Sequence, residues 1–219
     1  MSKYYKSYKE LQRDNLYGID YQIDTRISFP KDFLIVAPHG GTIEPGTSEI
    51  TKKIASNRFN YYSFESLRDY GPDYISLHIT SHLFDEPKCV RWSKQHNWVV
   101  TIHGCNVQSQ KIYLGGLNHE LKIYVKNSLR EACFTIADDG HKYGGVHPSN
   151  ICNIGKSGSG LQIELAIPLR QPKVFDLISS SIGLGLEKFL KQNGKSMWKQ
   201  WDIWIYIAYF LLSYCSVIM

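Results

Sequence analysis

The sequence predicts a single α/β domain with a mixed, largely parallel central sheet flanked by helices. Short apolar runs bounded by Gly and Pro, typical of buried strands, alternate along the chain with stretches of helical period. No internal repeat or low-complexity tract interrupts them. The 219 residues, 43% of them hydrophobic and 21% charged, suffice for one ordinary core and argue against a disordered or collagen-like chain.

The N-terminal half is expected to begin with a short, polar, tyrosine-rich helix within residues 1–20. The run FLIVA at 33–37 is apolar and is broken by a proline and two glycines, which predicts a buried strand that ends in a loop. The segment SEITKKIASN at 48–57 has isoleucines four residues apart and predicts a helix. The alternating segments at 61–67 and 74–79 predict two further strands.

The C-terminal half continues the alternation of strands and helices, which indicates a layered α/β domain. A polar connection at 87–97 leads into WVVTI, which predicts a second buried strand at 98–102. The remaining expected elements are a helix at 118–131, a short strand at 134–137, a long polar loop at 138–160, the strand LQIEL at 161–165 and an amphipathic helix at 173–191.

Charge and cysteine content exclude several classes of protein. Lys and Arg total 25 against 20 for Asp and Glu, and this dispersed net charge of +5 predicts no nucleic-acid partner but is compatible with a polyanionic ligand. Five cysteines without a CxxC pair argue against a disulfide scaffold or a structural zinc knuckle. The first residues contain no apolar h-region, so no signal peptide is expected and the protein is expected to be cytoplasmic when made.

The last 17 residues, 203–219, carry no charge, a length at the short limit for a membrane span. They could anchor the chain in a membrane, form a buried terminal helix or strand, or extend a domain that has already ended. The last two interpretations together are favoured, because nothing upstream is typical of a membrane protein. We therefore expect one domain over residues 1–195, followed by an apolar tail at 196–219.

Candidate metal ligands follow the two expected buried strands. His39 and Glu44 lie five residues apart in a glycine-containing segment that can turn back onto one point, and His103 follows the strand at 98–102. Ligands of open α/β sheets bind outside the carboxyl ends of the strands. Two imidazoles and one carboxylate are a usual protein shell for a catalytic zinc. On spacing alone, a His after a strand is more often an ordinary loop residue.

Glu164 is a candidate general base. In LQIEL, Leu161, Ile163 and Leu165 are expected to face one side of the sheet, and Gln162 and Glu164 the other. A carboxylate within an apolar strand is costly unless it is paired or used, and a hydrolytic zinc site needs a base beside its water. The alternative is an edge strand whose glutamate is simply solvated.

Other reactive side chains have simpler interpretations. One of His78 and His82 would lie near the site, but a structural role is favoured for both. Cys105 closely follows His103 and could act as a nucleophile, although a small buried residue is the favoured interpretation.

Six motifs carry a resemblance to a known family: APHGGTIEPGTSEI, HITSHLFDEP, TIHGCN, YLGGLN, NICNIGKSGSGLQIEL and PLR. Up to about residue 190 the chain resembles the phage-type poly-γ-glutamate hydrolase family, whose members are similar to zinc carboxypeptidases in fold. The resemblance implies one zinc held by His39, Glu44 and His103, with Glu164 as the catalytic carboxylate. It also implies a poly-γ-glutamate substrate and a phage or prophage enzyme that degrades host capsule outside the cell after lysis.

The chain departs from the family at Ile154, where an Arg is usual that could bind a substrate carboxylate or the oxyanion. Arg170 in PLR remains as a catalytic cation that could replace it. Two rivals stay open: a zinc amidase or carboxypeptidase acting on small peptides, and a non-catalytic binding or regulatory phage protein. Membrane contact through the tail is a further alternative.

Overall fold

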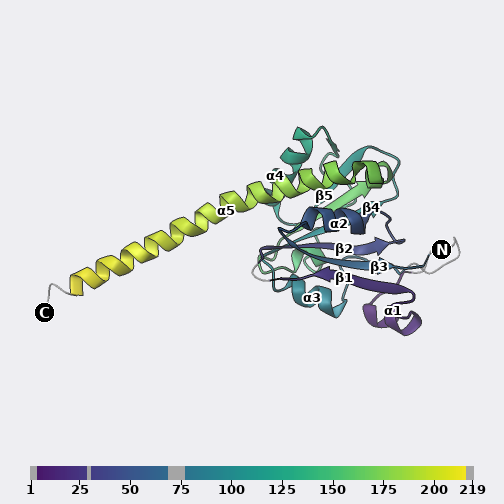
Figure 1. Cartoon of the computed structure of the whole chain (residues 1–219), viewed down its shortest axis with the longest axis horizontal. Coiled ribbons are helices and arrows are strands. Elements are labelled where there is room, and N and C mark those ends of the chain that lie inside the picture. The colour runs from purple at the N-terminus through teal and green to yellow at the C-terminus, as the bar shows by residue number, and fades with distance from the viewer. Residues whose placement is uncertain (1–3, 29–30, 69–76, 216–219) are drawn as a thin grey trace.

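The computed structural model describes residues 4–28, 31–68 and 77–215, with 194–215 described by their backbone alone. It confirms a mixed α/β domain built on a seven-stranded sheet of order β1-β3-β2-β4-β7-β5-β6 (Figure 1). The strands are β1 (Tyr21–Arg26), β2 (Phe33–Gly41), β3 (Asn60–Ser66), β4 (Trp98–Cys105), β5 (Lys111–Gly115), β6 (Thr135–Ile136) and β7 (Leu161–Ala166). The helices are α1 (Tyr8–Asp14), α2 (Thr47–Ala55), α3 (Pro87–Ser93), α4 (His119–Glu131) and α5 (Pro172–Cys215), with short 3-10 turns at Ile151–Asn153 and Ile167–Arg170.

The centre of the sheet is parallel. Strands β3, β2, β4 and β7 pair in parallel, while β1 runs antiparallel to β3 and β5 antiparallel to β7. The carboxyl ends of the four parallel strands therefore meet at one edge of the sheet, which is where the sequence places its candidate site residues.

Both faces of the sheet are covered, as a largely parallel sheet requires. Phe33 and Ile35 of β2 face a large core formed with α2, α4 and α5. Leu34 and Val36, the alternate residues of the same strand, face a second core that includes Leu11 of α1 and residues around α3. This two-residue alternation explains why β2 is a continuous apolar run.

The polar connection expected at 87–97 is wrong, because its first part forms the helix α3. The Glu86 side chain caps this helix by accepting hydrogen bonds from the backbone N–H groups of Lys88 and Cys89, at 3.2 and 2.8 Å. Pro87 lies in the first turn, where it costs no hydrogen bond. The Glu86 cap and Pro87 therefore decide that this segment is helical, despite its polar composition.

Two strand expectations also change. Strand β5 was not expected, because five residues carry little periodicity. Of the strand expected at 74–79, residues 74–76 lie outside the described residues, and Ile79 makes only an isolated bridge with Tyr5.

Helix α5 is much longer than the expected helix at 173–191, since its backbone continues to Cys215. Gly194 does not end it, as a single glycine costs a helix only about 1 kcal/mol relative to alanine. Figure 1 shows the first part of α5 packed along the domain and the later part continuing past it. Within the described residues, no helix combines the length and the apolarity needed to cross a membrane.

Removing residues 196–219 is expected to leave a folded and fully active protein. Among the residues whose side chains the structure describes, Leu186, Phe189 and Leu190 of α5 pack in or against the core, and all three precede the cut. The melting temperature, sedimentation and activity of residues 1–195 should be measured beside the full chain. An unfolded or inactive truncation would show that the tail is part of the domain, and partition of the full chain into membranes would support an anchor.

Candidate functional site

His39 lies inside β2 and not in a loop after it, which corrects the expected end of this strand. The pairing of β2 with β3 changes register between Ala37 and Gly40, and such an irregularity re-aims side chains. Pro38, which has no N–H group to donate, lies within the irregularity. The His39 side chain is only 2% exposed, so β2 places this imidazole in the interior at the carboxyl edge of the sheet.

Glu44 folds back onto His39 through a tight turn. The Glu44 N–H donates to the His39 carbonyl at 3.0 Å, and Gly41 makes the turn possible with a φ of +63°. A Cβ at Gly41 would lie 2.2 Å from the Ser66 carbonyl oxygen, so no other residue fits. Glu44 Oε1 lies 3.0 Å from His39 Nδ1, and Oε2 accepts the Gly104 N–H at 2.8 Å.

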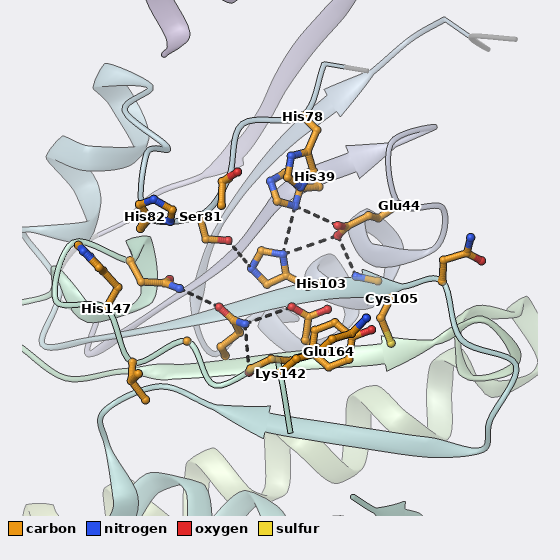
Figure 2. A pocket seen from close by; sticks show the side chains of 18 residues that line it. His39, Glu44, His78, Ser81, His82, His103, Cys105, Lys142, His147 and Glu164 are labelled. Atoms are coloured by element: carbon orange, nitrogen blue, oxygen red, sulfur yellow. Dashed lines mark hydrogen bonds and ion pairs between the residues drawn. The ribbon is translucent and has the colours of Figure 1, made fainter. Parts of the chain in front are cut away.

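His103 completes this group from the neighbouring strand. It too lies within a strand, because β4 continues to Cys105 through its pairing with β7. Its Nδ1 is 3.2 Å from His39 Nδ1 and 3.7 Å from Glu44 Oε2, and its Nε2 is 3.4 Å from Ser81 Oγ. Figure 2 shows the two imidazoles and the carboxylate directed at one another. The structure thus brings together the three ligands predicted from the sequence.

The proton positions in this group favour a bound cation. His39 Nε2 lies 2.8 Å from the Ile79 carbonyl oxygen, which can only accept, so in the neutral imidazole Nε2 carries the proton. His39 Nδ1 is then a bare lone pair that faces the Glu44 carboxylate and His103 Nδ1. The two Nδ1 atoms and the two oxygens of Glu44 are electron-rich, and their contacts of 3.0, 3.2 and 3.7 Å are repulsive unless a proton or a metal ion lies among them. The donor set therefore fits a divalent metal.

His78 is a fourth side chain of the same group. Its ring stacks on His39, with centroids 3.9 Å apart and planes inclined by 29°. One ligand atom each from His39, Glu44 and His78 lie within 4.8 Å of one another. His78 Nδ1 is buried and has no hydrogen-bond partner among the described residues. Burial, followed by the nearby charge of His39, lowers the pKa of His78 to about 3, so its imidazole is a neutral donor.

The charges of the group stabilise one another. Burial alone would raise the pKa of the Glu44 carboxyl, but His39 and His103 outweigh it and hold this pKa well below its usual range. Burial disfavours the charged form of His103, yet its contact with Glu44 and the charge of Glu164 raise its pKa. Glu44 is therefore an ionised carboxylate at neutral pH, as a metal ligand must be.

Glu164 lies beside His103 in the centre of the sheet. Strand β7 is flanked by β4 and β5, so the edge-strand alternative is wrong, and His103 and Glu164 are partners in register. The Glu164 side chain is 8% exposed, and one oxygen accepts a hydrogen bond from Gln162 Nε2 at 3.1 Å. Burial raises the pKa of the Glu164 carboxyl, and the charge of Glu44 adds to the rise, although His103 opposes it.

All of these side chains line one cavity of about 540 Å³. Both His78 and His82 line it, whereas the sequence placed one of them near the site and favoured a structural role. Sequence reasoning missed Ser81, Lys142, Tyr143 and His147, which come from loops where no period marks them. Gln162 carried a signal, because it shares a strand face with Glu164. The rings of His82 and His147, whose centroids lie 5.1 Å apart, are on one side of the cavity (Figure 2).

Arg170 is held beside the site by backbone carbonyls. Its guanidinium donates to the carbonyl oxygens of Pro45, Leu165 and Cys105, at 2.5, 3.1 and 3.5 Å. It is not among the described residues that line the cavity. Arg170 therefore links the loop after β2 to the carboxyl ends of β4 and β7. Ile154, the departure from the family pattern, packs against the second core.

Cys105 lines the cavity, but burial raises the pKa of its thiol, which therefore stays protonated and is a poor nucleophile. This agrees with its expected role as a small buried residue.

Comparison with known proteins assigns the family. A family described as Poly-gamma-glutamate hydrolase matches residues 5–182. YndL of Bacillus subtilis (strain 168) is 33% identical over 182 residues, which cover 81% of this chain and 70% of YndL. The SPbeta prophage-derived protein YoqZ of the same organism is 32% identical over 169 residues, covering 76% of this chain and 60% of YoqZ.

Solved structures agree with the fold. A bacteriophage poly-gamma-glutamate hydrolase superposes with a TM-score of 0.80 at 24% identity, covering 86% of this chain and 98% of that one. The zinc-free apo form of YndL gives 0.75 at 28% identity, with 84% and 96% covered. A candidate carboxypeptidase A from Shewanella denitrificans OS-217 gives 0.53 at 12% identity, covering 75% of this chain and 58% of that one, which confirms the carboxypeptidase-like fold. From the family match and the identity to YndL, we conclude that the chain belongs to the poly-gamma-glutamate hydrolase family.

Proposed function

We propose that the protein is a zinc-dependent hydrolase that cleaves the γ-glutamyl amide bonds of poly-γ-glutamate. The observation that carries the proposal is the convergence of His39, Glu44 and His103 beside the buried carboxyl of Glu164 in one cavity. Family membership supports the polymer as substrate.

Zinc is the metal that we propose for this centre. Zinc binds His nitrogen and carboxylate oxygen at about 2.0–2.2 Å, which at tetrahedral angles separates the ligand atoms by about 3.3–3.6 Å. The two Nδ1 atoms here are 3.2 Å apart, His39 Nδ1 is 3.0 Å from Glu44 Oε1 and His103 Nδ1 is 3.7 Å from Glu44 Oε2, and these separations bracket that range. The zinc-free description of the YndL structure supports the same metal. When bound, zinc supplies Lewis acidity, which polarises a carbonyl and acidifies water.

The protein's own residues move the proton and hold the site. Glu164 takes a proton from the attacking water and passes it to the nitrogen of the leaving amine as the C–N bond breaks. Its raised pKa suits both steps, because a carboxyl that is too acidic would not retain the proton. Gln162 fixes one oxygen of this carboxyl through a hydrogen bond. Arg170, which the sequence placed among the catalytic residues, instead holds Pro45, Cys105 and Leu165 in place through hydrogen bonds to their carbonyl oxygens and so positions the site.

A viscosity assay tests the proposal. The protein should lower the viscosity of a poly-γ-glutamate solution, lose this activity with a chelator and regain it with Zn²⁺. Poly-α-glutamate is the matched control, because it carries the same charge on a different backbone. Cleavage of short γ-glutamyl peptides without loss of polymer viscosity would support the small-peptide amidase, and neither activity would support a non-catalytic protein.

Hydrolysis is expected to weaken as the ionic strength rises. The substrate is a polyanion, the chain has a net charge of +5, and Lys142 lines the cavity. Lys111 and Lys156, which are near the site motifs in sequence, are exposed and are not among the described lining residues. Because the Debye length falls from about 30 Å at 0.01 M salt to about 3 Å at 1 M, KM should rise several-fold over this range. An unchanged KM would remove the electrostatic part of the proposal.

We also propose that the enzyme degrades the capsule of a host bacterium and acts outside the cell after lysis. The names of two similar proteins support a phage setting, one a bacteriophage hydrolase and the other prophage-derived. Clearance of capsule from encapsulated cells by the purified protein would test this role.

A further inference from the structure

A second cavity of about 430 Å³ lies between α4 and the segment that follows β6. Helix α4 contributes His119, Lys122, Ile123 and Lys126, whose spacing of three, four and seven residues forms a single stripe along the helix. The opposite side is formed by Asp139, Gly140, His141, Gly144 and Val146, and Leu114 completes the lining.

The two lysines of this cavity are half-buried, yet no ion pair or hydrogen bond of either ammonium group is recorded within the part of the chain that the structure describes. Lys52, which is equally half-buried, instead lies 2.6 Å from Asp24 and 2.9 Å from Glu65. Within the described residues, neither Nζ atom is among the buried side-chain atoms that lack a partner, so the ammonium groups of Lys122 and Lys126 reach solvent at the cavity and can pair with an external anion. Among the described lining residues Asp139 is the single carboxylate, and the two lysines exceed its charge.

The two cavities are separated by one stretch of chain. Lys142, Tyr143 and Gly145 line the first cavity, whereas the intervening His141 and Gly144 line the second. Val146 lines both and is 62% exposed. Residues 141–146 therefore separate the two cavities, and the exposed Val146 lies where they meet. An extended ligand that passes over Val146 enters both cavities.

We propose that the second cavity is a distant subsite for the same polymer chain whose bond is cleaved in the first. This inference rests on the proposed function. A γ-linked glutamate polymer carries a free carboxylate on every residue and two methylene groups between successive amides. Lys122 and Lys126 match the carboxylates, and Ile123, which is 56% exposed, matches the methylene groups. The subsite gives the enzyme a preference for long chains over short ones.

The double variant Lys122→Ala/Lys126→Ala tests the subsite. Its KM for long poly-γ-glutamate should rise by about five- to tenfold with kcat unchanged, in keeping with two solvated ion contacts. Its KM for a γ-linked dimer, whose two residues both flank the cleaved bond in the first cavity, should not change. Lys122→Arg/Lys126→Arg should retain the wild-type preference. The matched control is Lys88→Ala/Lys94→Ala on and just after α3, which removes the same charge from two exposed lysines on the other face of the sheet.

Equal effects on polymer and dimer, or equal effects of the control pair, would overturn the subsite. Binding separates this result from failure of the proposed function. In a Glu164→Gln background, the Kd for poly-γ-glutamate should rise about five- to tenfold when both lysines become alanine, at an unchanged melting temperature. An unchanged Kd overturns the subsite whether or not the wild-type enzyme cleaves the polymer. Absence of cleavage by the wild type contradicts the proposed function itself.

Discussion

Glu164→Gln is expected to lower kcat for poly-γ-glutamate by about 10²–10⁴-fold while one zinc per chain stays bound. The amide has the shape of the carboxyl but cannot accept the proton of the attacking water. Zinc is retained because the three predicted ligands, His39, Glu44 and His103, lie within 3.7 Å of one another without it. Steady-state kinetics and metal analysis of the same preparation measure both effects.

Glu131→Gln is the matched control for this substitution. Glu131 is the last residue of α4, and its exposed carboxylate pairs with Lys188 at 2.7 Å, far from any proposed chemistry. It should keep wild-type kcat and zinc content. Parallel loss of zinc and activity in Glu164→Gln would instead make Glu164 a metal ligand.

His103→Ala is expected to abolish stoichiometric zinc binding and, with it, hydrolysis. Removal of a ligand should exceed the ~10–100-fold loss of affinity that follows removal of a ligand's hydrogen-bond partner. Zinc titration with a competing chelator measures the affinity, and the melting temperature of the zinc-free protein shows whether the variant remains folded.

His78→Ala is the informative comparison, since His78 also lies within ligand distance of His39 and Glu44. Its ring stacks on His39, whereas His103 directs Nδ1 at His39 Nδ1. We therefore expect His78→Ala to keep one zinc per chain. Loss of zinc in His78→Ala together with its retention in His103→Ala would exchange the roles of the two histidines.

Much of the fold was predictable because apolar runs and helical periods depend only on local sequence. The runs at 33–37 and 98–102 became β2 and β4, and 161–165 became β7, all at the centre of the sheet. Helix α3 was missed because its hydrophobic face is short and its start depends on the Glu86 cap. The ends of β2 and β4 were also wrong, because pairing with neighbouring strands extends them through glycines that are weak strand formers.

The site was predictable where it follows strand ends and unpredictable where it depends on loops. His39, Glu44, His103 and Glu164 gather as expected, because parallel strands bring their carboxyl ends to one edge. Ser81 and its neighbours are instead held by contacts distant in sequence, such as the hydrogen bond from the Ile151 N–H to the Ser81 carbonyl at 3.0 Å. No local pattern encodes such contacts, so Lys142 and His147 carried no usable signal, and His82 could be named only as one of two histidines near the site.

Alternate residues of strand β7 serve the core and the proposed chemistry. Leu161, Ile163 and Leu165 are fully buried in the core, whereas Gln162 and Glu164 face the cavity. A buried carboxyl lowers the stability of the folded protein, so Glu164 serves the chemistry at a cost in stability. Tolerance to mutation along β7 should therefore alternate with a two-residue period: odd positions are constrained by folding and even positions by turnover. Selection of variants for stability alone would favour replacement of Gln162 or Glu164, and such variants would lose hydrolytic activity.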